Sequence, residues 1–186
     1  AQNIGTYIKG SGESIWVGSP LIVHRRCANP MFEISNETTY DDMMILGRDG
    51  ASKFANTNVQ TKWIDVRSEE WIGNYNKAEG EVVKELLAGE LASQNYNIRI
   101  ITPFKDVCRN LKGAGTIHTM HGKEADVIVF VLGGATKGAR AWAASKPNLL
   151  NVALTRAKEV IYIVGNRENW ASLPYFEVAA RKIDKG

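Results

Sequence analysis

The residues with the clearest chemical potential are arginines placed beside predicted strands. Arg25 and Arg26 directly follow the strand-forming run Leu21–His24, and Arg156 lies just before the apolar run "VIYIVG". A guanidinium group is planar, always charged and able to bind two oxygens of one phosphate at once. The alternative for each arginine is an ordinary surface side chain that is solvated, ion-paired or capping a helix. The residue types therefore permit phosphate chemistry without requiring it.

A complete phosphate-binding loop is missing from the sequence. Such a loop needs G-x-x-x-x-G-K-[ST], in which backbone amides surround the phosphates, the lysine reaches them and the hydroxyl holds Mg²⁺. The nearest segment, "GGATKGAR", has Gly133 and Gly138 at this spacing, but Ala139 and Arg140 stand where Lys and Ser or Thr are required. We therefore expect no nucleotide hydrolysis by this chain alone. Arginines that stabilise a transferred phosphoryl group can, however, come from a second domain.

Strand-forming and helix-forming segments alternate along the chain, which predicts an α/β fold with a mostly parallel sheet flanked by helices. Two of the strand-forming runs, "VIVFVL" and "VIYIVG", are continuously apolar, as expected for strands covered on both faces. In such sheets, ligands bind beyond the carboxyl ends of the strands. The predicted strands are Leu21–His24, Trp63–Val66, Ile98–Thr102, Thr116–Thr119, Asp126–Leu132 and Glu159–Gly165.

The clearest helical pattern covers Lys77–Gln94, where apolar residues recur with the period of a helix. Asn76 and Glu79 are predicted to form an N-terminal capping pair for this helix. The segment 133–147 has no such pattern and is predicted to be a loop. Further helices are predicted over Asn29–Tyr40 and Phe104–Gly113, after Pro174, and before Arg156, where Leu150, Val152 and Leu154 would pack it.

Composition is that of one soluble globular domain, with 44% hydrophobic and 23% charged residues. No apolar run approaches the roughly 20 residues that cross a bilayer, and no signal peptide is recognisable. Cys27 and Cys108 have no metal-like spacing, so we expect reduced thiols in a cytoplasmic protein that makes no membrane contact. The net charge of +3 permits a polyanionic partner.

Four segments resemble motifs of superfamily 1 helicases. "GTIHTMHGKEADVIVF" (Gly115–Phe130) resembles motif V, and "NLLNVALTRAKEVIYIVGN" resembles motif VI. "PLIVHRRCANPMFEISNETTY" resembles motif IV, and "IRIITPFKDV" is similar to the Thr-Pro-Tyr segment between them. The best match is the nonsense-decay-helicase-like branch and, within it, bacterial AAA-type helicases. The resemblance runs from Pro20 to Ile183 in the expected order, which makes it far more specific than a single motif.

The resemblance implies a RecA-like domain, which is the P-loop NTPase fold, here without its own P-loop. Residues 1–186 would form one such domain, the second of a longer ATP-dependent helicase, and 1–19 would be a loosely packed lead-in from the preceding domain. The implied partners are the N-terminal RecA-like domain of the same protein and single-stranded DNA or RNA. ATP would bind with Mg²⁺, and the Mg²⁺ would be held mainly by the absent domain, so that the isolated domain would be inactive.

The resemblance also implies an ATP-facing set of residues. Arg156 matches the motif VI arginine that reaches the γ-phosphate across the interdomain cleft, and Arg26 matches the motif IV arginine that makes a second γ-phosphate contact. Arg25 stands where relatives often place a tyrosine near the base, and its guanidinium plane can stack similarly. Glu124 matches a carboxylate that accepts hydrogen bonds from the ribose, and Gly122 would let the backbone approach closely.

A second set is implied to contact nucleic acid. Thr102, Thr116 and Thr119 correspond to positions at strand ends whose hydroxyls or amides contact phosphates of a single strand, and His118 lies among them. Such contacts position a strand without reading its sequence. β-propensity alone explains Thr116 nearly as well. His121 replaces the glutamine of motif V, which puts the interaction of that amide in doubt.

Two further readings stay open for this region. His118, His121 and Glu124 form a close His/His/carboxylate group, but they lack the helical spacing of a zinc site and a fourth ligand, so no metal is expected. Trp142, in the segment 133–147, is a candidate base-stacking or partner-contacting residue, with a solvated loop as the simpler reading. For the whole chain, the alternative function is a free-standing nucleic-acid- or nucleotide-binding module without motor activity. A weaker option is a helicase-like subunit whose ATP site forms with a separate chain.

Overall fold

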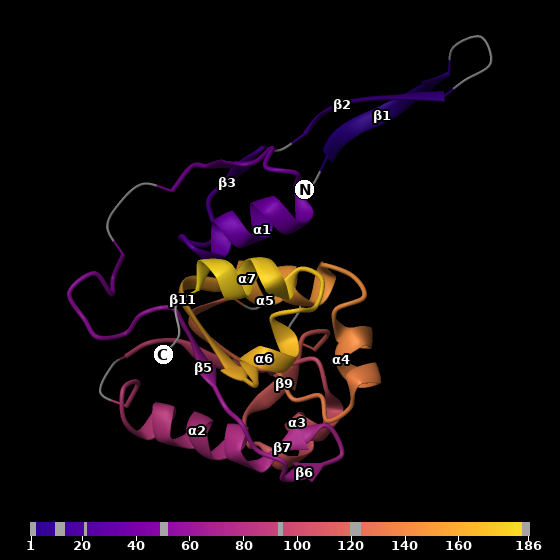
Figure 1. Ribbon diagram of the computed structural model, residues 1–186. Helices are drawn as coiled ribbons and strands as arrows, with labels where there is room; N and C mark the ends of the chain where they lie inside the picture. Colours follow the sequence, from indigo (N-terminus) through magenta and orange to yellow (C-terminus); the bar gives the residue numbers. More distant parts are fainter. Residues whose placement is uncertain are drawn as a thin grey trace.

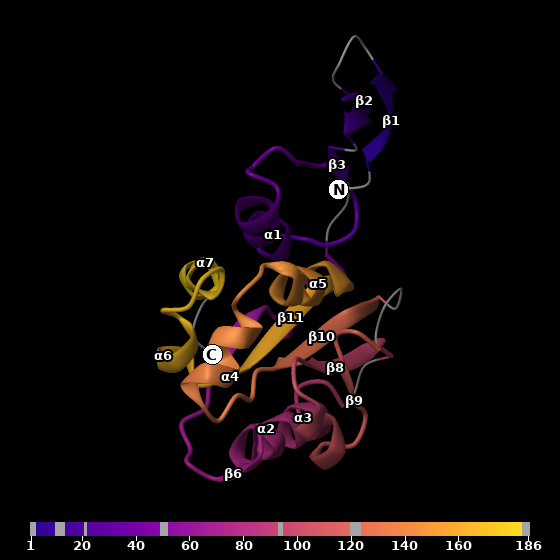
Figure 2. The same ribbon diagram turned by 90° about the vertical axis from the view of Figure 1, so that its right-hand side faces the viewer.

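The computed structural model of the chain describes residues 3–9, 14–20, 22–48, 52–92, 95–119 and 124–183. Within these ranges, five strands form one parallel sheet in the order β5-β11-β10-β8-β9, which occupies the middle of the molecule (Figure 2). The predicted α/β fold with a parallel sheet is confirmed. The strands are β5 (Lys62–Asp65), β8 (Ile98–Thr102), β9 (Ala114–Thr116), β10 (Ala125–Val131) and β11 (Ala157–Gly165).

Helices cover both faces of this sheet, so the molecule has three layers (Figures 1 and 2). One face carries α2 (Lys77–Ala88) and α3 (Lys105–Asn110), and the other carries α5 (Asn148–Arg156), α6 (Arg167–Trp170) and α7 (Phe176–Lys182). Helix α1 (Met31–Thr39) packs outside this layer, against α5 and α7. Helix α4 (Lys137–Ala143) lies in the connection between β10 and α5.

The core lies along the two central strands. Every residue from Val127 to Leu132 in and after β10 is fully buried, and so are Ile161 to Val164 in β11. Their continuous apolar sequence is therefore explained by cover on both faces, as predicted. Trp63 and Trp170 are also fully buried against this core. The sheet is consequently a rigid base from which residues at the strand ends project.

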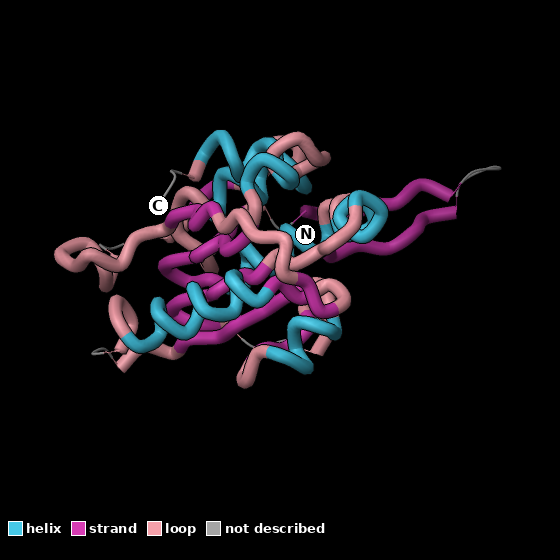
Figure 3. Tube along the Cα trace, turned by 60° about the horizontal axis from the view of Figure 1, so that its bottom comes forward, coloured by secondary structure: helices cyan, strands magenta, loops and turns pink. Residues whose placement is uncertain are grey.

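Three small two-stranded sheets lie outside the central one. β1 (Asn3–Lys9) and β2 (Ser14–Pro20) form an antiparallel hairpin that extends away from the body of the molecule (Figures 1 and 3). β3 (Val23–His24) pairs in parallel with β4 (Ile45–Leu46), and β6 (Trp71–Ile72) pairs with β7 (Tyr75–Asn76). That residues 1–19 lead in from a preceding domain stays a prediction.

Several predicted boundaries differ from the structure. Thr116–Thr119 was predicted as a strand, but β9 ends at Thr116 and the next three residues form a turn. The predicted loop 133–147 contains α4, which Thr136 caps through its side-chain oxygen. Helix α2 stops at Ala88, because Gly89 ends it well before Gln94. None of the described helices combines the length and apolar character that a bilayer span requires.

Candidate nucleotide and nucleic-acid site

Three of the predicted ATP-facing residues, Arg26, Glu124 and Arg156, lie where β10 and β11 begin, which we call the amino edge of the sheet. Glu124 directly precedes Ala125, and Arg156 directly precedes Ala157; these two alanines pair across the strands. Neighbouring strands lie about 5 Å apart, so Glu124 and Arg156 leave adjacent positions. These residues therefore lie at the end of the sheet opposite to the carboxyl ends, where ligand-binding residues were expected. The reason is topological, because Arg156 ends a helix that leads into a strand.

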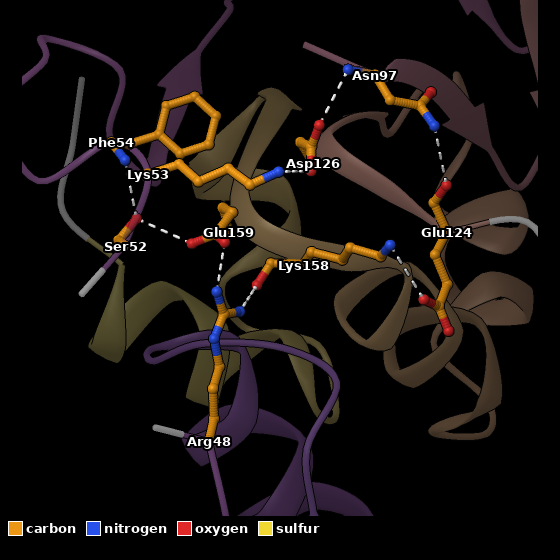
Figure 4. Close-up of polar contacts among 9 residues, drawn as sticks. All are labelled: Arg48, Ser52, Lys53, Phe54, Asn97, Glu124, Asp126, Lys158 and Glu159. Carbon is orange, nitrogen blue, oxygen red and sulfur yellow. Dashed lines mark hydrogen bonds and ion pairs between the residues drawn. The ribbon is translucent and has the colours of Figure 1, made fainter. Parts of the chain in front are cut away.

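Glu124 lies between two cations. Arg26 Nε is 2.7 Å from Glu124 Oε1, and Lys158 Nζ is 3.6 Å from Glu124 Oε2. Figure 4 shows the Lys158 side chain reaching toward Glu124. The Arg26 side chain is 46% exposed and that of Glu124 is 29% exposed, so both remain accessible from solvent. Arg156 directly precedes the neighbouring strand, next to the alanine that pairs with Ala125, so its backbone belongs to the same edge.

Arg156 occupies the last residue of α5 and is partly buried. Its Nε is buried and has no hydrogen-bond partner among the residues that the structure describes. Leaving a buried donor unsatisfied costs about 1–3 kcal/mol, which a ligand oxygen would recover. Leu150, Ala153 and Leu154 bury the other side of the helix, so its end is fixed. Of the predicted packing residues, Val152 is only partly buried.

Hydrogen bonds that sequence reasoning missed tie α5 to α1. Ser35 donates to Asn151 Oδ1 at 2.5 Å, and Asn151 Nδ2 is 3.5 Å from the Tyr40 hydroxyl. Thr155 donates to the carbonyl of Asn151 at 2.8 Å within the helix. Asn151 and Thr155 therefore position the end of α5, at which Arg156 is the last residue. The only signal in the sequence was the clustering of these polar residues beside an otherwise apolar helix face.

Hydrogen bonds from the backbone amides of Cys27 and Ala28 hold the turn that carries Arg26. Cys27 N donates to His24 Nε2 at 3.2 Å, and Ala28 N donates to the carbonyl of Lys158 at 3.1 Å. Burial, with the nearby Arg26 charge, lowers the pKa of His24, and burial raises the pKa of the Cys27 thiol to about 12. Both groups are consequently uncharged at neutral pH. The charges of this turn are therefore those of Arg25 and Arg26.

A second ion-paired group supports the start of β11. Arg48 donates to Glu159 and to the carbonyl of Lys158, and Ser52 donates to Glu159 at 2.9 Å (Figure 4). Glu159 is only 7% exposed, so this pairing satisfies a buried charge. Asp126 accepts from Asn97 N at 3.2 Å and from Lys53 at 3.1 Å, which fits the structural role predicted for it. These contacts fix the backbone on both sides of Lys158.

Arg25 and Gly122 are the remaining residues that were predicted to face ATP. Arg25 is exposed, and its side chain lies across Gly47, where an added Cβ would come within 3.5 Å of it. Gly122 and His121 lie outside the described residues. Among those that are described, no group of three or more His, Cys, Asp or Glu is arranged to hold a metal ion.

The predicted nucleic-acid residues lie at the opposite, carboxyl edge, where β8 and β9 end. Thr102 pairs with Thr116 across these strands. Thr102 is fully buried, and its hydroxyl accepts from Phe104 N at 3.2 Å, so it shapes the turn into α3 and does not face solvent. Thr119 is exposed and donates to the carbonyl of Thr116 at 2.9 Å. His118 is also exposed.

A hollow of about 680 Å³ opens at this edge. Its lining includes Thr116, His118 and Thr119 together with Phe104, Lys105 and Trp142. Three of the four predicted nucleic-acid residues thus share one concave surface. Their proposed contacts with a nucleic acid stay predictions.

The glycine-rich loop after β10 cannot act as a phosphate-binding loop in this conformation. Gly133 N donates to Glu79 Oε2 at 2.9 Å, and Gly134 N donates to the carbonyl of Asn74 at 3.0 Å. Arg140 donates to the Gly134 carbonyl at 2.8 Å. The two amides that would face a phosphate are therefore occupied. The structure adds this geometric reason to the missing lysine and hydroxyl.

Glu79 also departs from its predicted role. Asn76 caps α2 by accepting from Ala78 N at 3.0 Å and Glu79 N at 3.4 Å, as predicted, but the Glu79 carboxylate turns inward to Gly133. Burial raises the pKa of this carboxyl group to about 8, against the opposing hydrogen bond from Gly133. A shift of this size often marks functional sites, but here the group serves the loop behind the hollow.

The parallel five-stranded sheet between two helical layers defines a RecA-like α/β domain. The profile of the AAA domain family matches residues 19–168, which is most of the chain. This chain therefore belongs to the AAA domain family. Comparison with curated proteins finds no significant match.

A solved structure shares the fold at low sequence identity, and two others match more weakly. The C-terminal domain of a possible DNA helicase from Lactobacillus plantarum WCFS1 is 13% identical, with a TM-score of 0.53, over 87% of this chain and 97% of that one. The helicase nonstructural protein 10 of an arterivirus is 16% identical alone and 17% identical in its complex with DNA, each with a TM-score of 0.39. Those matches cover 78% and 83% of this chain but only 25% and 28% of theirs.

Proposed function

We propose that this chain is the second motor domain of an ATP-dependent superfamily 1 helicase. In this proposal it supplies Arg156 and Arg26 to an ATP site that a first RecA-like domain completes, and it contacts a single strand of DNA or RNA at the carboxyl edge. Membership of the AAA domain family and the fold shared with the C-terminal domain of a possible DNA helicase support it.

The observation that carries the proposal is the charge arrangement at the amino edge. Arg26 and Lys158, which come from separate segments, pair with the carboxylate of Glu124, and the nearby Arg156 has a buried Nε without a partner among the described residues. A triphosphate carries several negative charges and many acceptor oxygens, so it fits this donor set. Buried donors in folded proteins usually have partners, so the Nε of Arg156 supports a ligand at this edge.

Each residue has a distinct part in this scheme. Arg156, fixed at the end of a packed helix, points a preorganised donor at the γ-phosphate, where charge spreads during transfer. Arg26 makes a second contact with the same phosphate once it leaves Glu124, and Glu124 then accepts from the ribose. Arg25 and Gly122 keep their predicted places near the base and at the close backbone approach. Mg²⁺ is assigned mainly to the first domain.

The two edges connect ATP to the bound strand. A γ-phosphate that bridges two domains favours the closed cleft, and its removal by hydrolysis releases that bias. Because the central strands β10 and β11 between the edges are buried in the core, closure moves the carboxyl-edge residues with them. Thr116, His118 and Thr119 then hold the strand in one state and release it in the other, which gives translocation.

The test is Arg156→Ala in the full-length protein. We expect ATP turnover with single-stranded nucleic acid to fall by about 10³-fold, as when an arginine finger is removed. Nucleotide affinity, measured with a fluorescent non-hydrolysable analogue, should fall only a few-fold. The matched control is Arg67→Ala, because Arg67 is 61% exposed and pairs with Asp65 and Glu168 far from the amino edge.

Unchanged turnover in Arg156→Ala would remove the central role assigned to this residue. A free-standing binding module remains the second candidate, and the missing phosphate-binding loop is the observation in its favour. Reading the gene upstream of Ala1 separates the two. A G-x-x-x-x-G-K-[ST] segment in an upstream domain supports the motor, and its absence supports the module or a site shared with a separate chain.

A further inference from the structure

Trp142 stands out at the carboxyl edge because a large aromatic ring is left in solvent. Of the tryptophans whose side chains the structure describes, it is the exposed one, at 54%, whereas Trp63 and Trp170 are buried. It lies on α4, within the segment that separates the two helicase-like motifs. An exposed tryptophan beside a hollow indicates a contact surface more often than a packing residue.

Contacts made by Phe104 and Arg140 stabilise the position of the Trp142 ring. Phe104, which is 6% exposed, contacts Trp142 with ring centroids 5.8 Å apart and planes at 45°. Arg140, two residues before Trp142, donates to the carbonyls of Gly134 and Ala135 at 2.8 and 3.3 Å and so fastens α4 to the loop after β10. Trp142 is consequently held in place without a ligand, and a preorganised ring loses little entropy on binding.

Hollows lie on two sides of the ring. One of about 680 Å³ is lined by Phe104, Lys105, Thr119 and Trp142, and one of about 240 Å³ is lined by Trp142, Lys146 and Leu149. His118 lines both. Hollows of roughly 300–1,000 Å³ accept small-molecule-sized groups. The two together provide room for flat groups beside the indole.

The charge around the hollows selects the class of occupant. Lys105 borders the larger hollow and Lys146 the smaller one, and both are exposed. Among the described residues that line the two hollows, none is acidic. The hydroxyls of Thr116 and Thr119 lie on the same wall, where they hydrogen-bond to each other and to the Thr116 carbonyl. An aromatic ring with a lysine on each side and hydroxyls between matches a backbone of phosphates with bases that stack.

We infer that Trp142 is a base-stacking platform for single-stranded nucleic acid, with Lys105 and Lys146 receiving the flanking phosphates. The inference rests on the proposed function and deepens it, because it assigns a further contact residue outside the helicase-like motifs. A duplex does not fit, since its bases are already stacked and cannot lie against the indole. An apolar peptide is disfavoured by the lysines and hydroxyls of the lining.

The experiment uses the full-length protein and two oligonucleotides of equal length, poly-dT and its abasic counterpart, with poly-rU as a parallel for RNA. Binding is followed by fluorescence anisotropy of an end label. Stacking on an aromatic side chain is worth about 1–3 kcal/mol per base, so the wild type should bind poly-dT roughly 5- to 100-fold more tightly than the abasic strand. Trp142→Ala should lower that ratio by at least about 5-fold and leave abasic binding unchanged.

Two variants complete the design. Trp142→Phe keeps a smaller ring and should retain part of the ratio, while Met43→Ala, which removes another exposed apolar side chain far from the hollows, should retain all of it. If Trp142→Ala leaves the ratio at the wild-type value, the inference is overturned while the helicase proposal stands. Equal loss on both oligonucleotides overturns it too. If the wild type binds neither oligonucleotide, both the inference and the nucleic-acid part of the proposed function fail.

Discussion

At the scale of single residues, Glu124 has the most constrained position at the amino edge. It pairs with Arg26 and approaches Lys158, and of these two cations Arg26 is the one proposed to contact phosphate. A carboxylate that accepts from a ribose must give up part of this pairing. Under the proposed function, Glu124 would therefore link recognition of the sugar to release of Arg26 toward the phosphates.

The first prediction concerns Glu124→Gln in the full-length protein. The wild type should turn over ATP with a lower KM than 2′,3′-dideoxy-ATP, because hydrogen bonds to a carboxylate are worth about 1.5–3 kcal/mol. Glu124→Gln should reduce this preference roughly ten-fold, because the neutral amide accepts more weakly. The ratio of the two KM values cancels the general effect of the lost negative charge, since that effect applies to both nucleotides. Glu81→Gln, an exposed residue paired with Lys84, is the control.

The second prediction concerns Glu79 and stability. Its pKa is raised from 4.5 to about 8 by burial, so the folded state holds a proton that the unfolded state releases at lower pH. This contribution is full below about pH 4.5, decreases as pH rises, and is lost above about pH 8. Thermal unfolding should show Tm falling across this window, and Glu79→Gln should flatten the fall. A wild-type Tm that does not change between pH 5 and 8 would contradict the assignment.

At the scale of elements, the end of α5 is the part that must be rigid. Asn151 joins it to α1 through Ser35 and Tyr40, and buried leucines fix its inner face. Arg156 contributes no anchor of its own among the described residues. The position of its guanidinium group therefore depends on the side chains of Ser35 and Tyr40, in and after α1.

The third prediction tests this dependence with Asn151→Ala. We expect kcat for ATP to fall about ten-fold with KM nearly unchanged. The displaced arginine would lose a contact that it makes only in the transition state. In an Arg156→Ala background, Asn151→Ala should cause no further loss, since both changes act through one group. Asn151→Asp, which keeps the oxygen that accepts from Ser35, should recover part of the activity. Additive losses in the double variant would assign Asn151 a merely structural role.

At the scale of the whole molecule, the two candidate sites occupy opposite ends of one buried sheet. Neither end forms a complete site, since the glycine-rich loop is closed by Glu79 and Asn74. Under the proposed function, the described chain provides one wall of a catalytic pocket and one surface for a strand. Activity is expected only from an assembly that includes a second nucleotide-binding domain.

The fourth prediction follows for residues 1–186 alone. Purified domain should show no ATP turnover above background, with or without single-stranded DNA, while the full-length protein is stimulated by it. The measurement is phosphate release at saturating ATP. Activity that copurifies with the isolated domain and is lost in Arg156→Ala would contradict the requirement for a second domain.

Strong local patterns explain which parts of the fold were predictable. The runs "VIVFVL" and "VIYIVG" admit only buried strands, and Asn76 caps α2 as its position indicates. Weak patterns did not predict the structure. Helix α4 was missed because its Gly, Ala and Lys residues form no clear apolar face. The turn Ile117–Thr119 was missed because β-branched residues favour strands, while the hydrogen bonds between Thr116 and Thr119 stabilise a turn.

The candidate sites, like the fold, could be predicted from the sequence only in part. The motifs located Arg26, Glu124 and Arg156, and the structure brings them to one edge of the sheet. Their contacts depend on pairing between distant segments, which a linear pattern does not contain. The hydrogen bond from Gly133 to Glu79 and the position of Phe104 under Trp142 are of this kind. Each requires the folded sheet before the partners meet.

The short connection between Thr119 and Glu124 has a mechanical consequence. Five peptide units join these residues, so their Cα atoms can never be more than about 18 Å apart. In the proposed function, Thr119 contacts the nucleic acid strand and Glu124 the nucleotide. Any displacement of one residue that nears this limit must pull on the other through covalent bonds, so under that proposal the two ligands would be coupled directly through the chain.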